Sequence, residues 1–256
     1  AMTDWAWRIP FLSSFVLVAV GLYVRLKLTE APIFIAALKK PKPKTLPMME
    51  VIVTHFKPFF LGMLICIAGY VLFYIMIAFS QIYAKSTPTV SEAGYTMGLG
   101  FSPQIFTALL MCSAISLAIT IAISGKYIDI VGRRIWLIWT TFGVSIFGLA
   151  LPYFLDNGTT TSLFWFLMIG MGLIGMGYGP LASFLPELFP THARYSGASL
   201  TYNISGLFGA SVAAIITLPL NANYGLKGVG IYLTLNAVLS LIGLWFITET
   251  KDKHLA

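Results

Sequence analysis

The chain has few charged residues and only two cysteines in 256 positions. Charged residues make up 10% of it, whereas a typical soluble domain has about 25%. Hydrophobic residues make up 58%, and the mean hydropathy is +0.86, so a soluble fold would lack polar surface. The cysteines, Cys66 and Cys112, both lie in apolar runs, which indicates neither a disulfide framework nor a Cys/His metal site. This composition is typical of a membrane protein.

The sequence also lacks the motifs of an enzyme. It has no phosphate-binding loop, no metal-ligand spacing, no Gly-x-Ser-x-Gly elbow and no histidine beside a nucleophile. Gly170, Gly172 and Gly175 have the Gly-x-Gly-x-x-Gly spacing of a dinucleotide-binding loop. They lie, however, in an expected hydrophobic helix with no strand before it. We therefore expect no catalytic residue, no cofactor and no bound metal.

Long apolar stretches are what the sequence has instead. A helix needs about 20 apolar residues to cross the hydrocarbon core of a bilayer, and unbroken apolar runs favour helices over barrel strands, which alternate with period two. The predicted fold class is an all-α polytopic membrane bundle with seven transmembrane helices, at residues 7–24, 59–79, 105–123, 135–155, 163–185, 198–218 and 229–247.

The positions of the basic residues predict the orientation of these spans. Of the 16 Lys and Arg residues, all but Arg8, Lys85 and Lys227 fall in alternate connections or the C-terminal tail. Lysine and arginine in short loops are retained on the cytoplasmic side. We therefore expect a multi-pass protein of the cytoplasmic membrane with its N-terminus outside and its C-terminus in the cytoplasm. The net charge of +7 then reflects topology and contact with anionic lipid, and no nucleic-acid partner is expected.

The segment SGKYIDIVGRR, residues 124–134, joins two of the expected spans. Gly125 and Gly132 permit a tight reversal and close approach of two helix ends. Asp129 can accept hydrogen bonds from the N-terminus of an adjacent helix. Arg133 and Arg134 can pair with acidic groups or phosphates; alternatively, they only retain the loop in the cytoplasm.

Three segments carry a resemblance to a known family: TDWAWRIPFLSSFVLVAVGLYVRLKLTEAPIF at the start, the GKYIDIVGRR turn, and PELFPTHARYSGASLTYN at 186–203. Together they resemble the metabolite:proton symporter family of the major facilitator superfamily, which includes shikimate, 2-oxoglutarate, citrate and proline or betaine permeases. The Arg-Ile-Pro and Glu-Leu-Phe-Pro-Thr blocks are the more specific ones, because the GRR turn is shared across the superfamily.

The resemblance implies helices six to twelve of a twelve-helix transporter, whose two lobes rock about a site at the bilayer midplane. Residues 1–27 would be the last helix of an N-terminal lobe that is otherwise missing, 28–56 the cytoplasmic interlobe linker, and 57–256 a six-helix C-terminal lobe. The odd number of spans and the start at Ala1 agree with a fragment. The turn would act as a conformational latch on the cytoplasmic side, formed by Gly125, Asp129, Gly132, Arg133, Arg134, Glu187 and Arg194.

Polar and aromatic side chains at membrane depth are the candidates for substrate contact, because such groups are costly in lipid unless they line a cavity or pair. The candidates are Tyr70, Tyr74, Gln81, Tyr178, Tyr202, Asn203 and Asn236, led by Tyr74, Asn203 and Tyr178. The alternative for each is ordinary packing, and Asn236 can be an interhelical hydrogen-bonding residue. A separate stripe of small residues recurs every four positions, at Gly197, Thr201, Ser205, Gly209 and Ala213, and predicts close helix packing.

The interiors of the seven expected spans contain no Asp, Glu, Lys, Arg or His. A proton-coupled symporter needs such a group in its pathway, so any coupling acid would come from the missing lobe. We expect secondary active transport of a small organic acid or zwitterionic metabolite, coupled to protons in the intact protein. A facilitative sugar-type carrier and a truncated, non-transporting accessory protein are the alternatives.

Overall fold

The computed structural model describes residues 5, 8–27 and 47–249 and divides the chain into two compact units, Ala1–Lys44 and Thr45–Ala256. Within the first unit, α1 spans Arg8–Lys27. Its 20 residues correspond to about 30 Å of helix, the thickness of the hydrocarbon core. A helix is therefore present where the first span is expected, and its crossing of the membrane stays a prediction.

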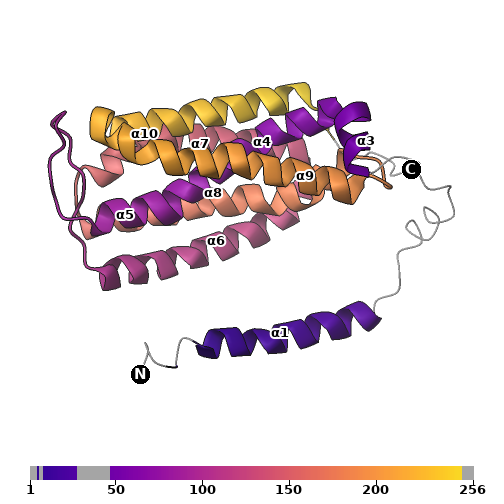
Figure 1. Ribbon diagram of the computed structural model, residues 1–256, viewed down its shortest axis with the longest axis horizontal. Coiled ribbons are helices and arrows are strands. Elements are labelled where there is room, and N and C mark those ends of the chain that lie inside the picture. The colour runs from indigo at the N-terminus through magenta and orange to yellow at the C-terminus, as the bar shows by residue number, and fades with distance from the viewer. Residues whose placement is uncertain (1–4, 6–7, 28–46, 250–256) are drawn as a thin grey trace. The chain divides into compact units, whose positions relative to one another are not determined.

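The second unit is a bundle of long helices (Figure 1). Its described part contains no strand, only one bridge pair between Val90 and Thr96. In chain order the elements are α3 (Pro47–Thr54), α4 (Phe56–Tyr74), the π-helical turn η2 (Ile75–Phe79), α5 (Ser80–Lys85), α6 (Pro103–Val131), α7 (Arg133–Leu155), α8 (Thr160–Glu187), α9 (Arg194–Gly206), the π-helical turn η3 (Leu207–Ser211) and α10 (Val212–Phe246). Residues 47–54 of the expected linker are thus helical.

Among the described residues, five helical stretches are long and apolar enough to cross a membrane: Phe56–Lys85, Pro103–Val131, Arg133–Leu155, Thr160–Glu187 and Arg194–Phe246. The last has 53 residues, or about 80 Å of continuous helix, too long for one crossing of about 30 Å. Gly225 breaks it with φ 65°, a conformation that glycine adopts readily. The chain reverses there (Figure 1), so this stretch supplies the last two expected spans. The all-α membrane bundle is confirmed.

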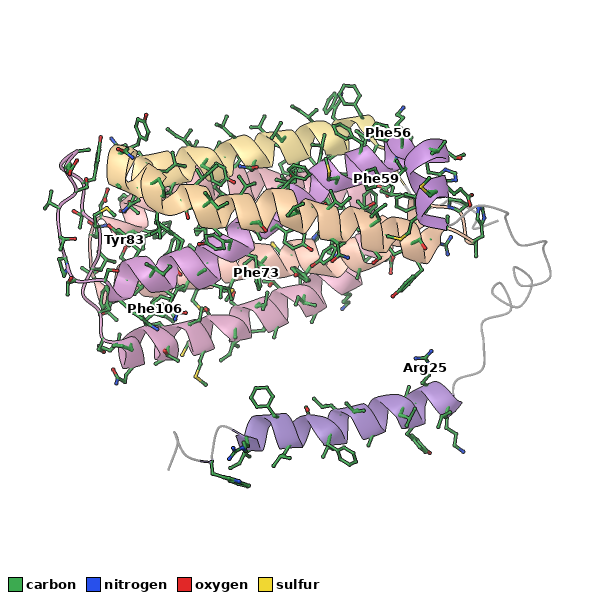
Figure 2. All side chains as sticks on the ribbon, viewed as in Figure 1. Arg25, Phe56, Phe59, Phe73, Tyr83 and Phe106 are labelled. Carbon is green, nitrogen blue, oxygen red and sulfur yellow. The ribbon has the colours of Figure 1, made fainter. Side chains whose placement is uncertain are left out.

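The main hydrophobic core lies where α4 and η2 pass between α7, α8 and α10. Val71, Ile75, Met76 and Phe79 are fully buried. Figure 2 places Tyr83 and Phe106, both 1% exposed, toward the end of the bundle that carries the 86–102 loop. Burial of this kind holds α4 and η2 as a central element of the bundle.

Small residues set the spacing between α6 and α8. A Cβ added at Gly175 would lie 2.6 Å from the carbonyl oxygen of Leu117, so only glycine permits this approach. Because the two helices lie so close together, two hydroxyl groups of α6 reach backbone carbonyls of α8. Ser116 Oγ donates to the Met168 carbonyl at 2.9 Å, and Ser124 Oγ donates to the Gly175 carbonyl at 3.3 Å. The glycine-rich segment of α8 therefore admits a neighbouring helix closely.

The predicted small-residue stripe on α9, η3 and α10 is buried along its whole length. Thr201, Ser205 and Ala213 are 0% exposed, and Gly197 and Gly209 are also buried. Ser205 Oγ donates to the Met63 carbonyl of α4 at 3.1 Å. The stripe's expected role in close helix packing is confirmed.

Candidate functional site

A network of charged groups gathers where α6, α8 and α10 end and α7 begins, and we call this end of the bundle the charged end. Gly132 alone joins α6 to α7, with φ 102°. A Cβ at this position would lie 2.9 Å from Glu249 Oε2. Glycine is thus required at position 132 for two reasons: the backbone has a positive φ, and the Glu249 carboxylate leaves no room for a side chain.

Glu249 caps the N-terminus of α7 from 116 positions away in sequence. Its Oε1 accepts a hydrogen bond from the Arg133 backbone N–H at 3.2 Å, and its Oε2 accepts one from the Arg134 backbone N–H at 3.0 Å. Such N–H groups have no partner within their own helix, and the helix dipole favours a carboxylate there.

Arg134 makes the reciprocal contact with the end of α10. Its Nε donates to the Leu244 carbonyl at 2.8 Å, and its Nη2 donates to the Trp245 carbonyl at 3.0 Å. These carbonyls lie in the last turn of the helix, where the dipole favours a cation. Glu249 and Arg134 together fasten the start of α7 to the end of α10.

Arg133 forms an ion pair with Glu187, at the end of α8. Its Nη1 lies 2.8 Å from Glu187 Oε2, and the two side chains are only 16% and 14% exposed. Asp129 lies 3.6 Å from Arg133 Nη2, but its side chain is 72% exposed, so this second pair contributes little to stability. The strong pair therefore joins α7 to α8.

Two further latch candidates lie apart from these contacts. A Cβ added at Gly125 would have no heavy atom within 4 Å, so this glycine makes no close helix approach within the described part of the chain. Arg194 begins α9 and is half-buried, and its Nε has no hydrogen-bond partner among the described residues. Their part in a latch stays a prediction.

Replacing Glu249 with alanine is expected to lower the free energy of unfolding by about 1–2 kcal/mol, because two N-terminal N–H groups of α7 lose their acceptor. Asp129→Ala is the matched control, since it removes an exposed carboxylate from the same turn and should change stability by less than about 0.5 kcal/mol. Thermal unfolding in detergent checks both. Equal effects of the two substitutions would contradict the capping role.

A cavity lies between α4, α7, α8 and α9, and three tyrosines contribute to its wall. Tyr178 on α8 and Tyr202 on α9 share a hydrogen bond between their hydroxyl groups, at 2.8 Å. The rings of Tyr202 and Tyr70 on α4 have centroids 4.9 Å apart and are tilted by 49°, a favourable aromatic arrangement. We call Tyr70, Tyr178 and Tyr202 the tyrosine cluster.

Glycines of α9 and η3 make room for the tyrosine cluster. A Cβ at Gly206 would lie 3.2 Å from the Tyr70 ring, and a Cβ at Gly209 would lie 2.6 Å from Tyr70 Cβ. The other polar side chains of the cavity wall are Cys66, Thr140 and Thr141. No charged residue is among the described residues that line it.

The other four substrate-contact candidates do not line this cavity. Tyr74 packs against the main core, and Gln81 is exposed on α5. Asn203 and Asn236 each donate to a backbone carbonyl one turn earlier in their own helix, Asn203 to Ser199 at 2.7 Å and Asn236 to Tyr232 at 2.8 Å. Of the three leading candidates, the structure places only Tyr178 in the cavity wall.

Comparison with known proteins identifies the family. The profile described as "Sugar (and other) transporter" matches residues 96–256, more than half of the chain. The chain belongs to this transporter family, within the major facilitator superfamily. The resemblance noted in the sequence is thereby confirmed at the level of family and membrane location.

Three relatives illustrate the match to this transporter family. The chain is 88% identical over 256 residues to a Haemophilus influenzae protein named "Putative metabolite transport protein", covering 100% of the chain and 57% of the relative. It is 39% identical to the Escherichia coli inner membrane metabolite transport protein YhjE (98% of the chain, 56% of the relative) and 25% identical to the Escherichia coli proline/betaine transporter (98% and 50%). The chain thus spans about half the length of these relatives. No solved structure matches it significantly.

Two features of this family member were missed by sequence reasoning. Glu249, which follows the last expected span, accepts hydrogen bonds from two backbone N–H groups of α7. Glu50, His55 and His192 converge although no metal-ligand spacing links them. A carboxylate just beyond a predicted helix is a possible cap for the N-terminus of another helix. The sequence alone does not show which helix that is.

Proposed function

We propose that the chain forms one lobe and one further helix of a secondary transporter that moves a small zwitterionic metabolite across the cytoplasmic membrane by alternating access. Family membership and the names of the relatives support transport of metabolites. The observation that carries the proposal is the uncharged tyrosine cluster, which lies in the wall of a cavity between four helices.

The chemistry of the cavity favours a zwitterion over an anion. Its described wall offers aromatic faces and hydroxyl groups but no lysine, arginine or histidine. Aromatic faces attract ammonium groups, most strongly where water is excluded, and tyrosine hydroxyls can donate to a carboxylate. An anion such as citrate would need a cationic side chain from outside this wall. The relatives named proline/betaine transporters are consistent with this choice.

The arrangement of the intact protein follows the same proposal. Residues 1–27 supply the last helix of the N-terminal lobe, 28–56 the interlobe linker and 57–256 the C-terminal lobe. The N-terminus of this chain lies outside and the charged end faces the cytoplasm, as the distribution of lysine and arginine predicts. Coupling to protons uses an acidic group of the other lobe, because the described cavity wall holds none.

The charged end serves as the latch of this proposed cycle. Rocking of two lobes requires contacts that form on one side of the membrane and break when the other side closes. Asp129, whose side chain is 72% exposed, is available to a helix of the other lobe. The Arg133–Glu187 and Glu249–α7 contacts hold the turn that presents Asp129.

Uptake into vesicles tests the proposal. The full-length transporter containing this chain is reconstituted and supplied with radiolabelled glycine betaine, citrate or glucose, with and without an inward proton gradient. Saturable uptake of glycine betaine that rises with the gradient is expected. The 256-residue chain reconstituted alone is the control and should show none, because half of the cavity wall would be missing.

The other outcomes of this experiment separate the alternatives. Saturable glucose uptake that does not depend on the proton gradient would overturn the proposal and identify the protein as a facilitative sugar carrier. Uptake of citrate alone would overturn the zwitterion assignment. Failure of the full-length protein to transport any of the three, with intact folding, would favour the accessory role.

A further inference from the structure

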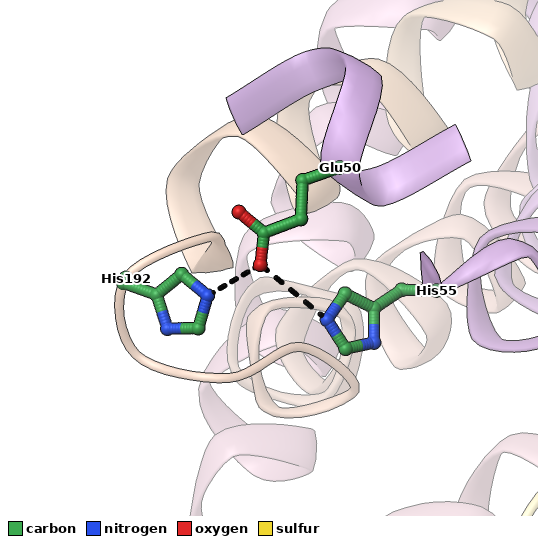
Figure 3. A group of neighbouring side chains, drawn as sticks. All are labelled: Glu50, His55 and His192. Carbon is green, nitrogen blue, oxygen red and sulfur yellow. Dashed lines mark hydrogen bonds and ion pairs between the residues drawn. The ribbon is translucent and has the colours of Figure 1, made fainter. Parts of the chain in front are cut away.

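A second polar cluster lies at the charged end, outside the network that Arg133 and Glu249 form. Figure 3 shows Glu50 of α3 between two imidazole rings. Glu50 Oε1 lies 2.6 Å from His192 Nε2 and 3.9 Å from His55 Nε2. Two of the chain's three histidines therefore meet at one carboxylate. These two histidines are 137 positions apart in sequence.

The packing beneath this cluster fixes the positions of its backbone. Val51 and Ala193, the neighbours of Glu50 and His192 in sequence, are both fully buried in one hydrophobic cluster with Phe59 and Phe189. This small core holds α3 against the segment that leads into α9. Side chains of Glu50 and His192 are therefore held close by residues that do not take part in the polar contact.

The chemistry of the three side chains matches a transition-metal site. Their potential ligand atoms, one carboxylate oxygen and two imidazole nitrogens, all lie within 4.8 Å of one another. A tetrahedral zinc ion with bonds of about 2.0–2.1 Å places its ligand atoms about 3.3 Å apart, between the observed 2.6 and 3.9 Å. Glu50 Oε2 is buried with no hydrogen-bond partner in the described structure. The carboxylate thus has an acceptor atom that an imidazole pair alone does not use.

We propose that Glu50, His55 and His192 form a binding site for a divalent transition-metal ion of the zinc class. Two imidazoles and one carboxylate leave a fourth coordination position for water, and oxygen and nitrogen ligands of this kind suit zinc better than calcium or magnesium. The His192 side chain is 47% exposed and the Glu50 side chain 15% exposed, so an ion can enter from the water side and be held against a carboxylate that is only partly exposed. A bound ion joins α3 to the α8–α9 connection and restrains the start of the Thr45–Ala256 unit.

Zinc binding to the tag-free chain tests the site directly. The protein is purified in detergent, stripped with chelator, and titrated with ZnCl₂ by calorimetry. Binding of one zinc ion per chain is expected, and each of Glu50→Gln, His55→Gln and His192→Gln should weaken it at least tenfold. His254→Gln is the matched control, because it removes the one histidine outside the cluster and should leave the affinity unchanged.

Two further measurements keep the test decisive. Zinc should raise the melting temperature of the wild type and of His254→Gln, since a ligand that binds only the folded state stabilises it. His192→Cys offers a thiolate in place of the imidazole and should retain zinc, which separates loss of a ligand from misfolding of a variant. The proposal is overturned if the wild type takes up no stoichiometric zinc, if the three cluster variants bind as the wild type does, or if His254→Gln loses as much affinity as they do.

Discussion

Replacing Arg133 with methionine is expected to destabilise the bundle by about 2–3 kcal/mol. Glu187 Oε2 lies 2.8 Å from Arg133 Nη1, and both side chains are less than one fifth exposed. Methionine keeps much of the length of the arginine side chain but leaves the Glu187 carboxylate without its cation. Removing one partner of a buried ion pair costs several kcal/mol, mostly because an uncompensated charge remains. Unfolding in detergent, followed by heat or denaturant, measures the loss.

The double variant Arg133→Met/Glu187→Met separates this cause from lost packing. Because neither charge is then left alone, its stability should return to within about 1 kcal/mol of the wild type. Glu187→Met alone should cost less than Arg133→Met, since Arg133 keeps Asp129 at 3.6 Å. Strictly additive effects of the two single substitutions would show that no coupling exists between these side chains.

Hydropathy identified the membrane-spanning helices but not where they end. The third span was expected to end at residue 123, whereas α6 continues to Val131. Ser124 and the residues after it are polar enough to leave the hydrocarbon, yet Ser124 is fully buried against α8. An apolar run reports how much of a helix lies in lipid, whereas helix ends are set by local contacts such as the positive φ of Gly132.

The candidate cavity could be predicted only in part for a similar reason. Helical periodicity shows which residues share a face of one helix, but it does not show which faces of four helices meet. Tyr70 and Tyr74 share a face by this rule, and yet Tyr70 lines the cavity while Tyr74 packs on the core. The meeting of Tyr70 with Tyr202 depends on Gly206 and Gly209, whose effect appears only when α4 and α9 are packed together.

Polar contacts between residues far apart in sequence were the feature that the sequence predicted least. Glu249 and the start of α7 are 116 positions apart, and Glu50 and His192 are 142 positions apart. In each case one partner lies just outside a predicted span or in a connection, where composition indicates only exposure to water. The helix order places these segments at one end of the bundle (Figure 1), and packing of the neighbouring apolar residues then selects the pairs.

Under the proposed function, replacing Tyr202 with alanine is expected to reduce glycine betaine uptake by the full-length protein at least tenfold. Tyr202 is the member of the tyrosine cluster that contacts both others. Its hydroxyl shares a hydrogen bond with the Tyr178 hydroxyl at 2.8 Å, and the centroids of its ring and the Tyr70 ring are 4.9 Å apart. Alanine removes an aromatic face from the cavity wall and releases both neighbours, and a loss of about 1.4 kcal/mol of substrate interaction corresponds to a factor of ten. Initial uptake rates over a range of substrate concentrations give KM and the maximal rate for each variant.

Tyr202→Phe and Tyr195→Ala show which part of the side chain matters. Phenylalanine keeps the ring and loses only the hydroxyl, so its uptake should fall less than that of the alanine variant and mainly through KM. Tyr195 lies two turns earlier on the same helix with 87% of its surface exposed, and its replacement by alanine should leave uptake within twofold of the wild type. If Tyr202→Ala is folded and transports with unchanged KM and maximal rate, the tyrosine cluster is only a packing element and the substrate site lies elsewhere.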